Sequence, residues 1–125
     1  NSLMPRVPYN AANWAVFMTG GSFAKVPPVD GVPFYETASS LLPMESQSID
    51  DVQWTLGAAG KGYIVYTMNG EVKLDLSADK RKYKVSWINP VTGELIQTKG
   101  LMKRVSGGEV CVLKAPEEYS VCLLY

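Results

Sequence analysis

Apolar and polar residues alternate with a period of two along much of the chain after residue 48. This is the spacing of half-buried β-strands, whose successive side chains point to opposite faces of a sheet. The clearest example is segment 72–76, in which valine and leucine share one face and charged residues share the other. Segments 52–56 and 83–87 repeat this alternation. Segment 63–68 is apolar on both faces, which indicates a central strand.

Three further segments complete the strand pattern, at 95–98, 110–114 and 119–125, the first of them weakly. About seven short strands at this spacing are typical of a small antiparallel β-sandwich. The predicted fold is therefore mainly β, with a short irregular and helical segment before the sandwich.

Turn residues separate these segments. Asn69-Gly70 is a strong hairpin signal, because both residues tolerate a positive φ, and it predicts a hairpin between 63–68 and 72–76. The sequence Asn-Pro-Val-Thr-Gly at 89–93 predicts a second turn. We expect residues 115–118 to close a last hairpin, which would join strands 110–114 and 119–125.

The first 48 residues differ in composition from the rest, because they hold six of the eight prolines of the chain. They leave room only for short elements. We predict one helix over 11–18, capped by Asn10 or Asn13, and another over 34–42. Neither is long enough to be stable without packing. We therefore divide the chain into an N-terminal segment, 1–48, that packs against a sandwich domain, 49–125.

The charged residues do not alter the predicted fold and point to no particular partner. Twelve basic and twelve acidic residues give a formal net charge of zero, so nothing indicates a nucleic-acid partner. The charged run at 79–82 is interpreted as a solvated turn. No apolar run approaches the length of a membrane span, so we expect no membrane insertion, and residues 1–6 lack the apolar stretch of a signal peptide.

Candidate catalytic chemistry is sparse. The chain has no histidine, which excludes Ser-His-Asp and Cys-His arrangements. The glycine-rich stretch 57–62 lacks the spacing of a phosphate-binding loop. Glu36, Glu45, Asp50 and Asp51 lie near the segment boundary, but each also fits a helix start or a solvated strand entry. We expect no complete active site, no cofactor and no metal in this chain.

The two cysteines leave two alternatives open. If Lys114 pairs with Tyr119 across the last hairpin, the same register places Cys111 opposite Cys122, within reach of a disulfide. The alternative, which we favour because a four-residue loop already fixes this hairpin, is that both cysteines are small buried apolar residues. Two cysteines alone do not make a structural zinc site, which needs four ligands.

The aromatic residues are the remaining candidates for binding, through stacking of a sugar ring on a flat side chain. Trp54 and Trp87 alternate with polar neighbours and are predicted to lie in the core. Trp14 lies in the irregular N-terminal segment, where periodicity does not place it. Trp14 and Trp54 are the candidate carbohydrate-binding residues.

A recognisable pattern is formed by four stretches of the chain, 62–66, 70–77, 83–94 and the closing stretch 115–124. They resemble the C-terminal domain, labelled collagen-binding, that follows the catalytic barrel of bacterial glycoside hydrolases with a DUF4038-type catalytic region. The Trp-x-Asn-Pro-x-Thr-Gly turn is the most distinctive part. The N-terminal segment resembles the last elements of such a barrel.

The resemblance implies a non-catalytic accessory domain of a secreted, periplasmic or cell-surface carbohydrate-active enzyme. Its partner would be the catalytic domain of that enzyme, on which it would pack and which it would stabilise. Two alternatives stay open, a carbohydrate-binding module for a polysaccharide and a protein–protein interaction domain that docks through a sheet edge at 95–98.

Overall fold

The computed structural model describes residues 9–20, 26–49, 52–101 and 103–125, and these form two antiparallel sheets. The larger sheet has six strands, in the order β1 (Leu42–Pro43), β2 (Gln53–Ala58), β3 (Gly62–Thr67), β8 (Ser120–Leu124), β5 (Lys82–Ile88) and β6 (Arg104–Ser106). The smaller sheet pairs β4 (Glu71–Asp75) with β7 (Val110–Lys114). The helical elements are α1 (Tyr9–Met18), α2 (Phe34–Ala38) and the 3₁₀ turn η1 (Glu45–Gln47).

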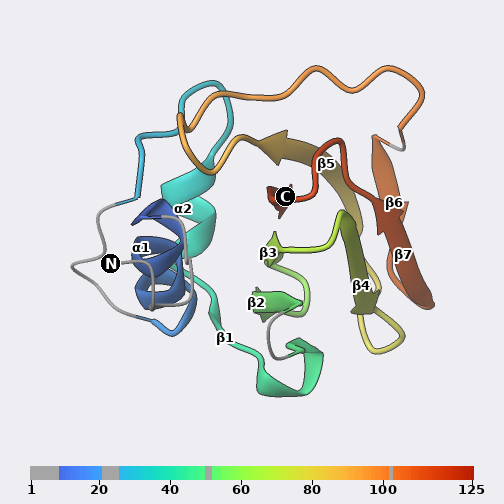
Figure 1. Cartoon of the computed structure of the whole chain (residues 1–125). Coiled ribbons are helices and arrows are strands. Elements are labelled where there is room, and N and C mark those ends of the chain that lie inside the picture. Colours follow the sequence, from blue (N-terminus) through green and yellow to red (C-terminus); the bar gives the residue numbers. More distant parts are fainter. Residues whose placement is uncertain (1–8, 21–25, 50–51, 102) are drawn as a thin grey trace.

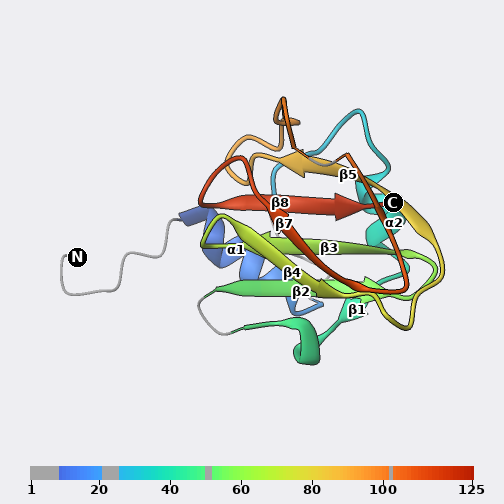
Figure 2. The same cartoon turned by 90° about the vertical axis from the view of Figure 1, so that its right-hand side faces the viewer.

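The elements are arranged in three layers, with the six-stranded sheet in the middle (Figure 1). The β4–β7 sheet covers one face of it and crosses its strands obliquely (Figure 2). Helices α1 and α2 cover the opposite face (Figure 1). The predicted mainly β, sandwich-like fold is confirmed, and helices cover the outer face of the larger sheet.

Strand β3 shows why its sequence is apolar on both faces. Tyr63 and Val65 point into the core between the two sheets, which also holds Leu74 and Trp87. Ile64 and Tyr66 point into a second core, under the helices. Alternate residues of a strand face opposite sides, so a strand covered on both sides needs apolar residues throughout.

Aromatic side chains attach the helices to the sheet. Trp14 is 0% exposed, and its ring meets the rings of Phe17 and Phe34 edge-on at centroid distances of 5.6 and 5.9 Å. Its indole N–H donates a hydrogen bond of 2.8 Å to the carbonyl oxygen of Pro90, in the turn that follows β5. The described part of the N-terminal segment therefore shares a core with the sandwich.

Both predicted helices exist, with different ends. Helix α1 begins at Tyr9, ahead of Asn10 and Asn13, so neither asparagine stands at its start. Helix α2 stops at Ala38 because the chain then turns to enter β1, which was not predicted.

The predicted last hairpin is wrong. Strand β7 pairs with β4, whereas β8 pairs with β3 and β5 in the other sheet. Burial explains this partition, because every residue of β8 is buried while most residues of β7 are not. A strand apolar on both faces is most stable in the centre of the covered sheet, and a strand with one apolar face suits the outer sheet. Residues 115–118 thus carry the chain between sheets.

The Asn69-Gly70 hairpin prediction is wrong for the same reason. Gly70 has the positive φ of 75° that the turn requires, but the turn leads from β3 to β4, which lie in different sheets. The predicted strand at 95–98 is also absent, and this stretch makes a single bridge from Leu95 to Ile88. The short β6, which was not predicted, pairs with the outer edge of β5 instead.

Two glutamine side chains cover the free edge of β4. The Gln53 amide accepts from the Lys73 N–H at 3.0 Å and donates to the Lys73 carbonyl oxygen at 2.8 Å. Gln47 makes the same pair of bonds to Asp75, at 2.6 and 3.0 Å. These amides replace a neighbouring strand, so the edge that could pair with another chain is satisfied internally.

We expect Gln53→Ala to lower the free energy of unfolding by about 2–3 kcal/mol. The substitution removes a buried amide and leaves the N–H and carbonyl groups of Lys73 without their partner. Urea denaturation measures the loss, and Gln97→Ala, in an exposed loop, is the matched control. A Gln53 variant as stable as this control would contradict the bridging role.

Candidate functional site

A hollow of about 390 Å³ opens where β3 and β5 end and β8 begins. We call it the aromatic hollow. Its lining comes from the three strand ends and their connecting turns: Tyr66, Asn89, Pro90, Val91, Glu117, Glu118 and Tyr119. Because each of these groups stands at the end of a paired strand or in a hydrogen-bonded turn, the site has a rigid frame.

Tyr66 is among the lining residues although its side chain is 0% exposed. Among the described residues, its hydroxyl oxygen has no hydrogen-bond partner. Burial, together with the nearby Tyr119, raises the pKa of Tyr66 to about 12, so the hydroxyl is neutral at ordinary pH. Buried hydroxyls are nearly always bonded, so this one marks a place where a ligand or water completes the structure.

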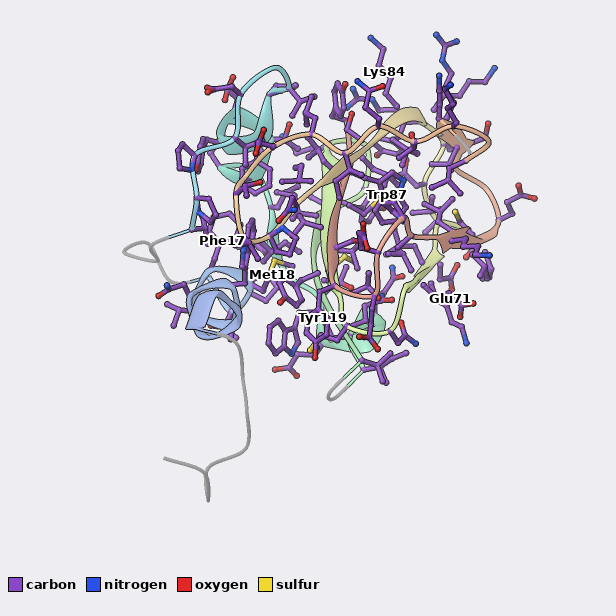
Figure 3. The ribbon with its side chains drawn as sticks, turned by 45° about the horizontal axis from the view of Figure 1, so that its top comes forward. Phe17, Met18, Glu71, Lys84, Trp87 and Tyr119 are labelled. Carbon is purple, nitrogen blue, oxygen red and sulfur yellow. The ribbon has the colours of Figure 1, made fainter. Side chains whose placement is uncertain are left out.

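Aromatic rings surround Tyr66. Trp54 lies against it at a centroid distance of 5.1 Å with an interplanar angle of 31°, and it is half-buried. Tyr119 meets Tyr66 edge-on at 6.4 Å and keeps 38% of its surface exposed. Tyr119 therefore offers ring surface at the mouth of the hollow. In Figure 3, Tyr119 lies well apart from Lys84.

Polar groups complete the rim. Glu117 and Glu118 are exposed, and the Ser120 hydroxyl holds their turn by bonding the backbone of Glu117. The Asn89 side-chain oxygen accepts from the N–H groups of Val91 and Thr92, at 2.8 and 3.2 Å, which fixes this turn. The lining of the hollow thus combines two acidic residues, the side-chain amide of Asn89 and an exposed ring.

The 89–93 turn was predicted correctly. The Gly93 N–H donates to the Asn89 carbonyl oxygen at 2.8 Å, and the Asn89 N–H donates to that of Glu94 at 2.8 Å. Gly93 has φ 77°, and a Cβ there would lie 2.2 Å from the Pro28 oxygen. Only glycine fits where the N-terminal segment crosses this turn.

The two tryptophans proposed as sugar platforms have different positions. Trp14 is enclosed in the core under the helices, so it presents no ring face to a ligand. Trp54 is partly accessible beside Tyr66. Trp87 lies in the core between the sheets, as predicted. Sequence reasoning missed Tyr66 and Tyr119, and only the adjacent Glu117-Glu118 pair before Tyr119 hinted at a polar aromatic rim.

Cys111 and Cys122 are free thiols in the structure. The register that placed them opposite each other does not form, since Cys111 pairs with Leu74 in one sheet and Cys122 lies between Val65 and Trp87 in the other. Both contact the core between the sheets. Burial raises the pKa of both thiols, which disfavours the reactive thiolate.

Asp79 is a second group of note, because it was predicted to be solvated and is 3% exposed. Its carboxylate accepts from the hydroxyls of Tyr63 and Tyr83, at 2.8 and 2.6 Å, and from the N–H groups of Gly60 and Arg81, at 3.0 and 2.9 Å. Burial alone would raise its pKa, but these four donors hold it at about 2. Every donor is internal, so the group supports the fold.

The described residues contain no group of three or more potential metal ligands, and none of their helices has the length and apolar character of a membrane span. No family model, curated protein or solved structure matches the chain. The fold and the hollow define a β-sandwich-like domain with an aromatic site.

Proposed function

We propose that this chain is a non-catalytic accessory domain of a carbohydrate-active enzyme and that it binds a glycan in the aromatic hollow. The observation that carries the proposal is Tyr66, which lines an open hollow beside an exposed tyrosine ring and whose buried hydroxyl has no partner among the described residues. A sugar hydroxyl is the kind of group that both donates to and accepts from such a phenol.

The other groups suit the same ligand. The exposed face of Tyr119 can stack on the apolar C–H face of a sugar ring. Glu117 and Glu118 can accept hydrogen bonds from sugar hydroxyls, and the side-chain amide N–H groups of Asn89 can donate them. Two carboxylates at the rim repel anionic sugars, so the hollow favours an uncharged one.

A packing role on a catalytic barrel is the second candidate. It is favoured by the outer surface of the helical layer, where Val16 and Tyr35 are 49% and 44% exposed. This layer is the part of the chain that resembles the end of a barrel. Apolar residues exposed on a domain of a longer protein suit contact with its neighbouring domain.

Substitutions in the hollow test the glycan proposal. We expect Tyr119→Ala to weaken binding of a neutral oligosaccharide by at least about tenfold, or about 1.4 kcal/mol, because it removes the stacking face. Tyr66→Phe removes a single oxygen and should weaken binding by a similar factor. Because that oxygen has no partner among the described residues, Tyr66→Phe should not lower the free energy of unfolding.

Calorimetric titration against a panel of neutral polysaccharides and oligosaccharides, with collagen included, measures these effects. Tyr35→Ala, an exposed tyrosine on the helical layer, is the matched control and should bind like the unmodified chain. If the folded chain binds no glycan, or if both hollow variants bind as tightly as the control, the glycan site is refuted and the packing role gains support.

A further inference from the structure

A second hollow, of about 600 Å³, lies along the outer edge of β5. Beyond β6 this edge is held to the 95–103 loop by two hydrogen bonds of 2.8 Å, from the Val85 N–H to the Lys103 oxygen and from the Ile96 N–H to the Trp87 oxygen. Between them the loop stands away from the strand. We call this opening the cationic groove, after four lining residues: Lys84, Lys99, Lys103 and Arg104.

Two of these cations are directly opposed. Lys84 on β5 pairs in register with Arg104 on β6, so their side chains leave the same face of the sheet as neighbours. Like charges at such a position are destabilising. The single ion pair among the described residues joins Lys73 to Glu71 on β4, outside the groove. None of the residues that line the groove is acidic. The repulsion is therefore uncompensated within this part of the chain.

A neighbouring aromatic ring holds one of these cations. The Lys84 ammonium lies 6.0 Å from the centre of the Tyr125 ring, which keeps it at the groove. Figure 3 shows Lys84 extending outward and Trp87 inside the molecule. Cations gathered on a lining that holds no acidic residue favour an anion.

Basic residues are distributed unevenly along the chain, which the net charge of zero does not show. Seven of the twelve basic residues lie between positions 80 and 104, where Glu94 is the only acidic residue. Strand pairing then brings the two basic stretches, 80–84 and 99–104, together at one edge. The net charge of zero therefore does not describe the local charge at this edge.

We infer that the cationic groove binds the carboxylate or sulfate groups of an acidic polysaccharide. That the ligand is anionic follows from the groove itself, and that it is a polysaccharide rests on the proposed function. A single-stranded nucleic acid fits less well, because such strands are held by stacking of bases on exposed rings as well as by cations. Of the two aromatic residues that line the groove, Trp87 is buried and Tyr125 has the Lys84 ammonium 6.0 Å from its ring centre.

The test measures binding of polygalacturonate and dextran sulfate to the whole chain at about 50 and about 300 mM NaCl, with neutral dextran as comparator. We expect binding of at least one acidic polymer that weakens about tenfold in the double variant Lys84→Gln/Arg104→Gln and falls at the higher salt concentration. Lys61→Gln/Lys114→Gln removes the same charge from exposed sites outside the groove and should bind within about twofold of the unmodified chain.

Relief of the Lys84–Arg104 repulsion predicts that the groove variant melts no lower than the unmodified chain, so lost binding would not reflect unfolding. Tyr119→Ala should retain the acidic polymer, which separates failure of the aromatic hollow from failure of this site. The inference is overturned if neither polymer binds at low salt, if the two double variants bind alike, or if single-stranded DNA of matched charge binds more tightly than both polymers.

Discussion

Asp79→Ala is expected to lower the free energy of unfolding by about 3–5 kcal/mol, because it leaves a set of buried donors without their shared acceptor. The Tyr63 and Tyr83 hydroxyls would each lose their bond to the carboxylate. The N–H groups of Gly60 and Arg81 would lose theirs as well, which loosens the turn before β5.

The same contacts predict a pH dependence. The pKa of Asp79 is lowered from 3.8 to about 2 in the folded chain, so the ionised carboxylate binds its donors more tightly than the protonated one. Its contribution, about 2 kcal/mol, is present in full above the unfolded pKa. It is lost as the pH falls from about 4 through about 2.

Urea denaturation at neutral pH and near pH 3 measures both effects. Asp75→Ala is the matched control, since Asp75 is an exposed acidic residue on β4 whose carboxylate bonds only Ser77 among the described residues. We expect this control to cost less than about 1 kcal/mol. An Asp79 variant that unfolds like the control, or that keeps the full pH dependence of the unmodified chain, would contradict the account of this cluster.

Trp14→Ala is expected to cost about 3–5 kcal/mol, the range for large-to-small changes of an enclosed aromatic residue. The substitution opens a cavity against Phe34 and Tyr66 and removes the bond from the indole N–H to Pro90. It also detaches the helices from the sheet, so residues on both sides of position 48 should lose stability together.

Urea denaturation followed by near-ultraviolet circular dichroism measures this loss. Val16→Ala, on the same helix but 49% exposed, is the control and should stay within about 0.5 kcal/mol of the unmodified chain. If the two variants proved equally stable, the N-terminal segment would not share a core with the sandwich.

The positions of most strands followed from the sequence, because alternation is a local signal that survives in the fold. Segments 72–76 and 83–87 agree with β4 and β5 to within a residue at each end. The doubly apolar segment 63–68 correctly marked β3 as central. Burial of Trp87 also followed from alternation.

Pairing could not be predicted, because it depends on contacts between distant residues. The turns after β3 and β7 have sequences typical of hairpins, yet each carries the chain from one sheet to the other. The burial of Asp79 depends on Tyr63, 16 residues earlier in the chain, and no local signal reports it.

The candidate site was hidden for the same reason. Tyr66 belongs to a plain apolar strand, and its unpaired hydroxyl becomes visible only when the ends of β5 and β8 lie beside it. Tyr119 was counted as the start of a strand. The cationic groove also depends on strand pairing. Because β6 was not predicted, the sequence alone did not place Arg104 beside Lys84.

The most direct test of the glycan site is a titration of the ¹⁵N-labelled chain with neutral oligosaccharides, followed by amide chemical shifts. We predict saturable shifts concentrated at Tyr66, at 89–91 and at 117–119, the lining of the aromatic hollow, with little change in the helices or along β6. Shifts confined to other surfaces, or no shifts with any neutral oligosaccharide, would contradict the proposal that this hollow binds a glycan.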